Sequence, residues 1–300
     1  MPNPKAVLIA NPKTGRHSSR RNSSIQTIRE HLTSQGLDTE LVFTSGPGDA
    51  TRIAARAASD GVSDVIVSGG DGTINEALQG LVGTDTRLAI LPCGTANVLA
   101  RELKVPLNPG RAAEVIAKRK LRRIHVGLAI DEGQNIHRYF LLMAGIGLDA
   151  EVVRRVNPQL KRHLGKGAFW LTGLSQLADW HPIEFTIEIN GQTYRSTFAS
   201  VGNAPSYGGE LAITPGASLD HPEFEICIVQ TTSRLRYLRL LSYAMRSSGL
   251  QPEEKGVCFV RSTQARAFGH DVAVQVDGEV IGVLPMRFEI APESIEVVVP

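Results

Sequence analysis

One stretch, from Asp64 to Leu81, constrains the fold more than any other part of the 300-residue chain. It begins with the apolar run Val65–Val67, which predicts a buried strand, and a cluster of glycines then ends that run. The apolar residues after the glycines recur at helical spacing: Ile74, Ala77, Leu78 and Leu81. The stretch therefore predicts a strand, a tight loop and a helix. A loop of this kind can hold a phosphate at the positive end of the helix dipole.

Asp71 lies inside this loop, between Gly70 and Gly72. A carboxylate beside a polyphosphate is repulsive unless a divalent cation bridges the two, so the loop indicates Mg²⁺ as well as phosphate. The alternative is structural, with Asp71 or Thr73 capping the helix by accepting a hydrogen bond from a first-turn N–H group. Two common motifs are excluded. No Lys-Ser or Lys-Thr pair follows the glycines, as a Walker A loop requires, and Asn75 replaces the third glycine of the dinucleotide fingerprint.

The composition is that of a soluble globular chain long enough for two domains, with 42% hydrophobic and 21% charged residues. A net charge of +2 and an aromatic content of 5% argue against nucleic-acid binding. Cys93, Cys227 and Cys258 are far apart and form no CxxC pair, which favours a reducing cytosol over disulfides or zinc. The first apolar run is too short for a signal peptide and no stretch reaches the length of a membrane span, so we expect a cytoplasmic protein.

Strands and helices alternate over the first 125 residues. Strands are expected at 5–10, 40–44, 64–68 and 87–91, and helices near 23–35 and 49–60 and after the two glycine loops. This order implies a parallel sheet with right-handed crossovers, in which ligands bind beyond the carboxyl ends of the strands. Loops with the polar and glycine residues of a binding site follow all four strands, at 11–15, 44–48, 69–73 and 94–97. Two of them repeat a Gly-Thr-x-Asn run, which favours a nucleotide site over plain turns.

From Arg122 onward, alternation of polar and apolar residues replaces helical spacing. The runs Arg122–Ile130 and His137–Ala144 each predict a strand, and Asn190-Gly191 predicts a hairpin with a type I′ turn. We expect an antiparallel β-sandwich or barrel, interrupted by helices near 159–180 and 234–246.

Three motifs carry a family resemblance: NPKTG at 11–15, SGGDGTINEAL at 68–78 and GTAN at 94–97. Together they resemble the diacylglycerol-kinase-like lipid kinases, which include bacterial diacylglycerol and YegS-type lipid kinases and the sphingosine and ceramide kinases. The resemblance covers nearly the whole chain. It implies an N-terminal Rossmann-like α/β domain that binds ATP (1–125, completed by 291–300) and a C-terminal antiparallel β-sandwich domain with inserted helices (126–290). It also implies transfer of the γ-phosphate to a lipid hydroxyl in the cleft between them.

The resemblance further implies the residues of each site. The ATP site is expected to contain Asn11, Thr44, Gly69, Gly70, Asp71, Gly72, Thr73, Ile74, Asn75, Glu76 and Thr95. Asp71 would lie near the catalytic Mg²⁺. Glu279, in the run Val-Asp-Gly-Glu at 276–279, would be the general base that removes the proton from the lipid hydroxyl. The same run also predicts a tight Asp-Gly hairpin turn.

Two departures from the family's pattern affect these expectations. Val98 follows Asn97 where many members have an aspartate, so any role of that second carboxylate is absent. Relatives also hold a structural Mg²⁺ in a loop that reads Asp-Asp-Gly, whereas this chain reads Asp-His-Pro at 220–222. Because Mg²⁺ prefers oxygen ligands to imidazole, Asp220 and Glu223 are the remaining candidates for this site.

Two basic clusters, at 118–123 and between Arg154 and Lys166 beside an apolar helix, are interpreted either as solvated faces or as contacts with an anionic membrane surface. The leading hypothesis is an ATP- and Mg²⁺-dependent kinase of diacylglycerol or a similar lipid, cytoplasmic and peripheral at the inner membrane face. The alternatives are a nucleotide- or lipid-binding protein without catalysis and a small-molecule kinase related to the kinases of NAD. The acceptor lipid and the oligomeric state stay open, with a homodimer as one option.

Overall fold

The computed structural model describes residues 5–12, 18–131, 133–134, 136–148, 150–151, 182–207, 211–233, 235–237, 239–240 and 256–300. Contacts divide the chain into two units, one made of residues 1–124 with 292–300 and the other of residues 125–291. Within the described ranges, no helix is both long enough and apolar enough to cross a membrane.

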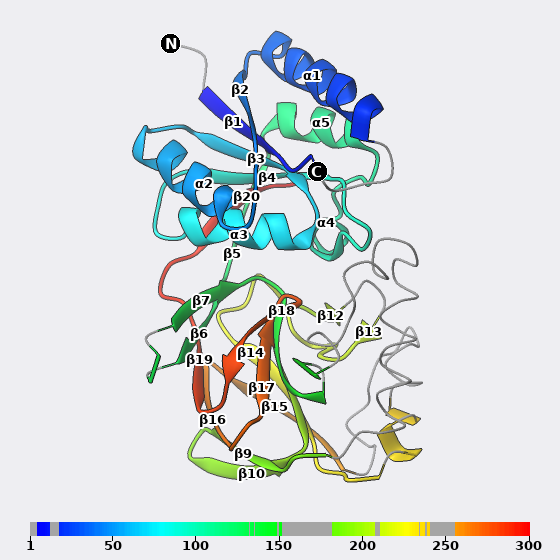
Figure 1. The fold of residues 1–300 in the computed structure, drawn as a ribbon, viewed down its shortest axis with the longest axis vertical. Coiled ribbons are helices and arrows are strands. Elements are labelled where there is room, and N and C mark those ends of the chain that lie inside the picture. Colours follow the sequence, from blue (N-terminus) through cyan, green and yellow to red (C-terminus); the bar gives the residue numbers. More distant parts are fainter. Residues whose placement is uncertain are drawn as a thin grey trace. The chain divides into compact units, whose positions relative to one another are not determined.

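The first unit is a sheet with helices on both faces (Figure 1). Its described strands are β1 (Lys5–Ala10), β2 (Asp38–Phe43), β3 (Asp64–Gly69), β4 (Arg87–Pro92), β5 (Leu121–Ile124) and β20 (Ile295–Val298). They follow the order β2-β1-β3-β4-β20-β5, in which only the pairing of β5 with β20 is antiparallel. The predicted Rossmann-like architecture is confirmed. Strand β20, which lies between β4 and β5, comes from the C-terminal end of the chain.

The helices described in this unit are α1 (Ser18–Ser34), α2 (Asp49–Ser59), α3 (Asp71–Leu81), α4 (Val98–Glu102) and α5 (Pro109–Lys118). Helices α1 and α5 lie together on one face of the sheet, and α2 and α3 lie together on the other (Figure 1). Strand β3 is buried along its whole length because both faces of the sheet are covered. Its apolar run therefore belongs to the core, and polar chemistry is confined to the strand ends.

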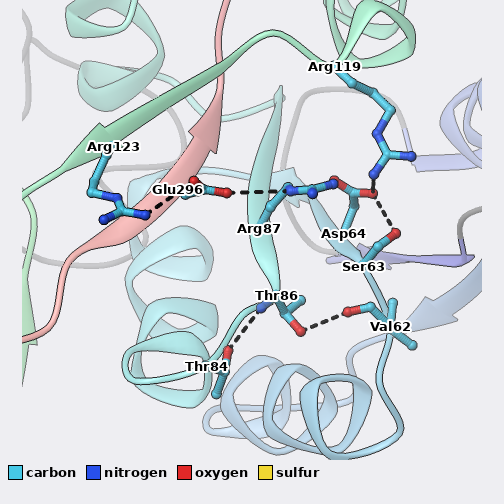
Figure 2. A network of polar contacts seen from close by, with 9 residues as sticks. All are labelled: Val62, Ser63, Asp64, Thr84, Thr86, Arg87, Arg119, Arg123 and Glu296. Carbon is cyan, nitrogen blue, oxygen red and sulfur yellow. Dashed lines mark hydrogen bonds and ion pairs between the residues drawn. The ribbon is translucent and has the colours of Figure 1, made fainter.

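A network of ion pairs links strands β3, β4, β20 and β5 at one end of this sheet (Figure 2). Asp64, the first residue of β3, is only 1% exposed and contacts Arg119 at 2.7 Å and Arg87 at 3.8 Å. Arg87 also contacts Glu296 of β20 at 3.5 Å, and Glu296 contacts Arg123 of β5 at the same distance. Two arginines of the predicted basic cluster at 118–123 are thus ion-paired within the unit, at the end of the sheet opposite to the glycine loops.

The second unit is an antiparallel β-sandwich (Figure 1). One sheet has the order β10-β9-β16-β19-β6-β7, with β6 (Gly127–Asp131), β7 (Ile136–Phe140), β9 (Phe185–Ile189), β10 (Gln192–Ser196), β16 (Gln264–Phe268) and β19 (Met286–Ile290). The other has the order β15-β14-β11-β8-β17-β18, with β8 (Met143–Gly147), β11 (Phe198–Gly202), β14 (Phe224–Val229), β15 (Val257–Ser262), β17 (Ala273–Val276) and β18 (Glu279–Val283). A short ladder joins β12 (Ser206–Tyr207) and β13 (Leu211–Ala212).

The inner faces of the two sheets share one apolar core, in which the rings of Phe140 and Phe224 stack with their centroids 5.7 Å apart. The predicted hairpin at Asn190-Gly191 joins β9 to β10, and its φ values of 51° and 78° are those of a type I′ turn. The helix expected near 159–180 and the second basic cluster lie outside the described residues. So does the helix expected near 234–246, except for helical residues at 235–237 and 239–240.

Two runs that predicted single strands are each divided. The run Arg122–Ile130 splits at His125 into β5, which pairs with β20, and β6, which pairs with β19 in the other unit. The run His137–Ala144 splits at Leu141 and Leu142 into β7 and β8, which belong to opposite sheets of the sandwich. The local sequence pattern does not reveal such breaks, because the strands on either side differ in the distant strands with which they pair.

Candidate functional site

The carboxyl ends of β1 to β4 bring the predicted loops together at one edge of the first sheet. Backbone hydrogen bonds link the strand ends in turn. Asn11 donates to Ser68 at 3.1 Å, Thr44 donates to Ala10 at 3.0 Å and Cys93 donates to Gly69 at 2.9 Å. The loops that follow β1, β3 and β4 therefore start side by side, where a ligand of a parallel sheet is expected.

The two Gly-Thr-x-Asn loops touch each other through their glycine backbones. A Cβ atom built on Gly94 would lie 2.6 Å from the Cα of Gly70 and 2.9 Å from Oδ1 of Asn97. A Cβ atom on Gly70 would lie 3.3 Å from the Cα of Gly94. A side chain at Gly94 would therefore push the two loops apart, whereas one at Gly70 would meet only a tight contact.

The carboxylate of Asp71 joins the same two loops. Asp71 is the first residue of α3, and its Oδ1 accepts a hydrogen bond from the backbone N–H of Leu99, in the first turn of α4, at 3.2 Å. The alternative that Asp71 or Thr73 caps α3 is wrong, because Gly70 is the N-cap residue and no side-chain hydrogen bond caps this helix. Asp71 instead stabilises the neighbouring helix. Its Oδ2 makes no hydrogen bond to a described residue.

Two further residues predicted at the ATP site connect α3 to neighbouring loops. Asn11 donates from Nδ2 to the hydroxyl of Thr73 at 3.2 Å, which links the end of β1 to the glycine loop. Glu76 accepts at Oε2 from the backbone N–H of Gly48 at 3.1 Å and so holds the loop after β2. These contacts place the four loops in a single connected arrangement.

The remaining predicted residues divide by exposure. Gly72 and Thr95 are exposed, and a ligand can reach them. Thr44, Ile74 and Asn75 are buried, so their side chains present almost no surface to solvent. Their predicted part in nucleotide binding stays a prediction and would involve mainly the backbone.

Asn97 has a role that the sequence did not reveal. Its Oδ1 accepts from the N–H of Gly94 at 2.8 Å, and its Nδ2 donates to the carbonyl of Gly94 at 2.9 Å. It is buried, with a left-handed φ of 50°. The Asn97 amide thus closes its own loop, a pattern compatible with the tolerance of asparagine for this conformation.

Asp49, the first residue of α2, has a carboxyl group with a shifted pKa and contacts the loop after β2. Asp49 accepts from the backbone N–H of Ser45 at 2.7 Å and pairs with Arg52 at 3.0 Å. These contacts, the Ser45 hydrogen bond first, lower the pKa of Asp49 from 3.8 to about 2. Asp49 therefore stays ionised and holds the loop shape across the neutral range.

In the second unit, the run at 276–279 forms the predicted hairpin between β17 and β18. Asp277 and Gly278 have φ values of 47° and 86°, as a type I′ turn requires. The carboxylate of Asp277 also accepts three backbone hydrogen bonds, from Leu141 at 2.8 Å, Leu142 at 2.9 Å and Met143 at 3.0 Å. This anchoring role of Asp277 has no signal in the sequence beyond its place in the turn.

Glu279, the predicted general base, is the first residue of β18 and its side chain is 59% exposed. Its Oε2 forms an ion pair with Nη2 of Arg138 on β7, a residue that the sequence did not single out. The two residues are 141 positions apart in the chain, so only the folded sandwich brings them together.

Comparisons with known proteins agree with this architecture in both halves of the chain. The family model of the diacylglycerol kinase catalytic domain matches residues 5–129. The family model of the YegS C-terminal NAD kinase beta sandwich-like domain matches residues 143–299, which is more than half of the chain. The chain belongs to the diacylglycerol-kinase-like lipid kinases.

Relatives of this lipid kinase align over nearly its whole length. A diacylglycerol kinase of Mycobacterium tuberculosis (strain ATCC 25618 / H37Rv) is 29% identical over 300 residues, covering 99% of this chain and 95% of the relative. A diacylglycerol kinase of Bacillus subtilis (strain 168) is also 29% identical, covering 99% and 96%. A crystal structure of a diacylglycerol kinase from Bacillus anthracis str. Sterne shares the fold, with a TM-score of 0.76, 24% identity and coverage of 99% and 97%.

Membership of a kinase family implies the use of ATP and, typically, of a divalent metal ion. In the part of the chain that the structure describes, no three His, Cys, Asp or Glu side chains are grouped to hold a metal. Mg²⁺ is commonly bound through one or two carboxylates, substrate phosphates and water. Asp71 fits this pattern as a single protein ligand, because its Oδ2 is not used by a described residue and Oδ1 is held by Leu99.

An arginine of β15 reaches the loop that was predicted to hold a structural Mg²⁺ in this lipid kinase. Arg261 contacts Glu223 at 2.7 Å and donates to the carbonyl of Gly216 at 3.1 Å. Glu225 accepts from the N–H of Gly216 at 2.7 Å. In this arrangement Glu223 and Glu225 do not fit a Mg²⁺ site, and Asp220 as a metal ligand stays a prediction.

Proposed function

We propose that this lipid kinase transfers the γ-phosphate of ATP, with Mg²⁺, to a hydroxyl group of diacylglycerol or a similar lipid. The observation that carries the proposal is the meeting of two glycine loops at Asp71, whose carboxylate is held at one oxygen and available at the other. Relatives described as diacylglycerol kinases support the acceptor class.

The first unit would bind and orient the nucleotide. Backbone N–H groups at the start of α3 would donate to the phosphates, and Gly72, where a Cβ atom would meet nothing within 4 Å, leaves room for their close approach. When bound, Mg²⁺ would neutralise the phosphate oxygens and stabilise the charge of the transferred group. Asp71 would hold this ion, in an orientation fixed by the N–H of Leu99.

The second unit would activate the acceptor. Glu279 would accept the proton of the lipid hydroxyl as that oxygen attacks the γ-phosphorus and ADP leaves with the electron pair of the broken P–O bond. Phosphoryl transfer depends mainly on positioning and electrostatics, so the base aligns the nucleophile more than it drives the reaction. Replacing Glu279 by Gln should therefore reduce turnover without unfolding the protein.

Transfer of labelled γ-phosphate tests this proposal. The purified protein is incubated with Mg²⁺ and ATP and, separately, with diacylglycerol, sphingosine, ceramide, monoacylglycerol and phosphatidylglycerol in mixed micelles, and with NAD. Label in one of the lipids supports the proposal and identifies the acceptor. Label in NAD alone would support the small-molecule kinase, and binding of ATP without transfer to any acceptor would support a binding protein.

We also propose that the lipid is met at an anionic membrane surface. Lys118 and Lys120 are exposed, whereas Arg119 and Arg123 are engaged in ion pairs, so only part of the basic cluster is available. Pelleting with phosphatidylglycerol vesicles should show binding that weakens with salt. Absence of any salt-sensitive binding would count against this mode of access.

A further inference from the structure

The backbone that carries Glu279 is fixed by its own hairpin. The turn places Asp277 so that its carboxylate binds the N–H groups of residues 141–143, while its own N–H donates to the carbonyl of Met143 at 3.0 Å. Gly278 donates to Oε1 of the buried Gln275 at 2.7 Å. Both turn residues that precede Glu279 are therefore tied to the interior of the sandwich.

The segment at 141–143 is itself held from its other side. Asn203, which is fully buried, donates from Nδ2 to the carbonyl of Leu141 at 2.9 Å. The backbone N–H groups of Asn203 and Ala204 donate to the carbonyl of Leu142 at 2.8 Å and 3.0 Å. Because this segment cannot move freely, the hairpin anchored to it cannot either. The freedom left to Glu279 lies in its side-chain torsions.

Arg138 restricts those torsions. It lies on β7, an edge strand of one sheet, and reaches Glu279 on β18, an edge strand of the other. Its Nη2 binds Oε2 of Glu279, while Oε1 makes no hydrogen bond to a described residue. The carboxylate is thus held at one oxygen and presents the other as a proton acceptor.

We propose that Arg138 is a positioning residue for Glu279. This inference rests on the proposed function, in which Glu279 is the general base. The pair is a weak candidate for a purely structural clamp, because Glu279 is 59% exposed and exposed ion pairs contribute little to stability. The ion pair can still affect the reaction rate through the position of the Glu279 carboxylate, since a displacement of a reacting group by about 1 Å can slow a reaction roughly 100-fold. In the reaction, the hydroxyl proton passes to Oε1 while Oε2 stays bound to Arg138.

The first test replaces Arg138 by Met, which keeps an unbranched apolar stem and removes the guanidinium. We expect kcat for the fastest acceptor of the lipid panel to fall by roughly 10- to 100-fold, with the KM for ATP unchanged. Arg138→Lys should restore part of the loss, because a single ammonium can still reach Oε2. The matched control is Arg287→Met, in the same sheet, where Arg287 pairs with Glu289 at 2.7 Å and is 33% exposed; its turnover should equal that of the wild type.

The second test combines Arg138→Met with Glu279→Gln. If Arg138 acts through Glu279, the double variant should be no slower than Glu279→Gln alone. Independent multiplication of the two losses would overturn the inference, as would wild-type kcat in Arg138→Met when Glu279→Gln is slow. Should Arg138→Met fail to fold, the double variant Arg138→Lys with Glu279→Gln decides by the same comparison. Wild-type turnover in Glu279→Gln would overturn the base assignment, and the inference with it.

Discussion

Replacing Gly94 by Ala should damage the nucleotide loops more than the fold. The new Cβ would lie 2.6 Å from the Cα of Gly70, whereas ordinary van der Waals contact begins at 3.4 Å. The loops must therefore separate by about 0.8 Å, the difference between these two distances. Overpacking of this kind costs typically about 1–3 kcal/mol, and a displacement near 1 Å at a reacting group can lower kcat roughly 100-fold.

Differential scanning fluorimetry and the phosphate-transfer assay measure the two effects in one preparation of Gly94→Ala. The fold should survive, with a lowered melting temperature, while ATP binding weakens and turnover falls. The matched control is Gly46→Ala, because a Cβ atom there meets nothing within 4 Å and the φ of Gly46 is not positive. Its stability and turnover should stay close to those of the wild type. Wild-type ATP affinity and turnover in Gly94→Ala would refute the idea that close contact of the two loops builds the site.

Three other predictions concern the ion-pair network, pH and the thiols. Asp64→Asn should lower the free energy of unfolding, measured in urea, by an amount near the lower end of about 3–5 kcal/mol, because the arginine partners of Asp64 keep 24–29% of their side chains exposed. The control Asp60→Asn, at an exposed residue, should change the free energy of unfolding little. Because the folded-state pKa of Asp49 is lowered to about 2, the stability that its ionised form contributes is present above about pH 4 and is lost as the pH falls toward 2. The stability difference between wild type and Asp49→Asn should therefore shrink over that range, and a constant difference would contradict the assignment. Iodoacetamide should label Cys93 before Cys227, because burial raises the pKa of the Cys227 thiol; mass spectrometry measures both labels. ATP with Mg²⁺ should slow the labelling of Cys93. Equal labelling of Cys227 would be inconsistent with its place in the core.

The features predicted from sequence are those set by short-range physics. The strand and helix around Asp71 follow from apolar spacing interrupted by glycines, and the turn at Asn190-Gly191 follows from the φ values that these residues tolerate. The antiparallel sandwich likewise follows from polar and apolar alternation in the second half. In each case the decisive residues are neighbours in the chain.

The features missed depend on contacts between distant residues. Asp71 binds Leu99, 28 residues away, rather than its own helix, because the glycine contact brings α4 within reach. Arg138 is 141 residues from Glu279, and neither residue has a local pattern that identifies the other. The break at Leu141 was missed for the same reason, since the partner of its N–H group is Asp277.

Calorimetric titration of ATP with Mg²⁺ and then with EDTA, into wild type and Asp71→Asn, tests the central claim most directly. Asparagine retains an oxygen for the N–H of Leu99 but lacks the negative charge that a divalent ion requires. We expect Mg²⁺ to strengthen ATP binding by the wild type, and we expect this gain to be largely lost in the folded Asp71→Asn variant. An equal gain in both proteins would show that the carboxylate among the glycines does not hold the metal.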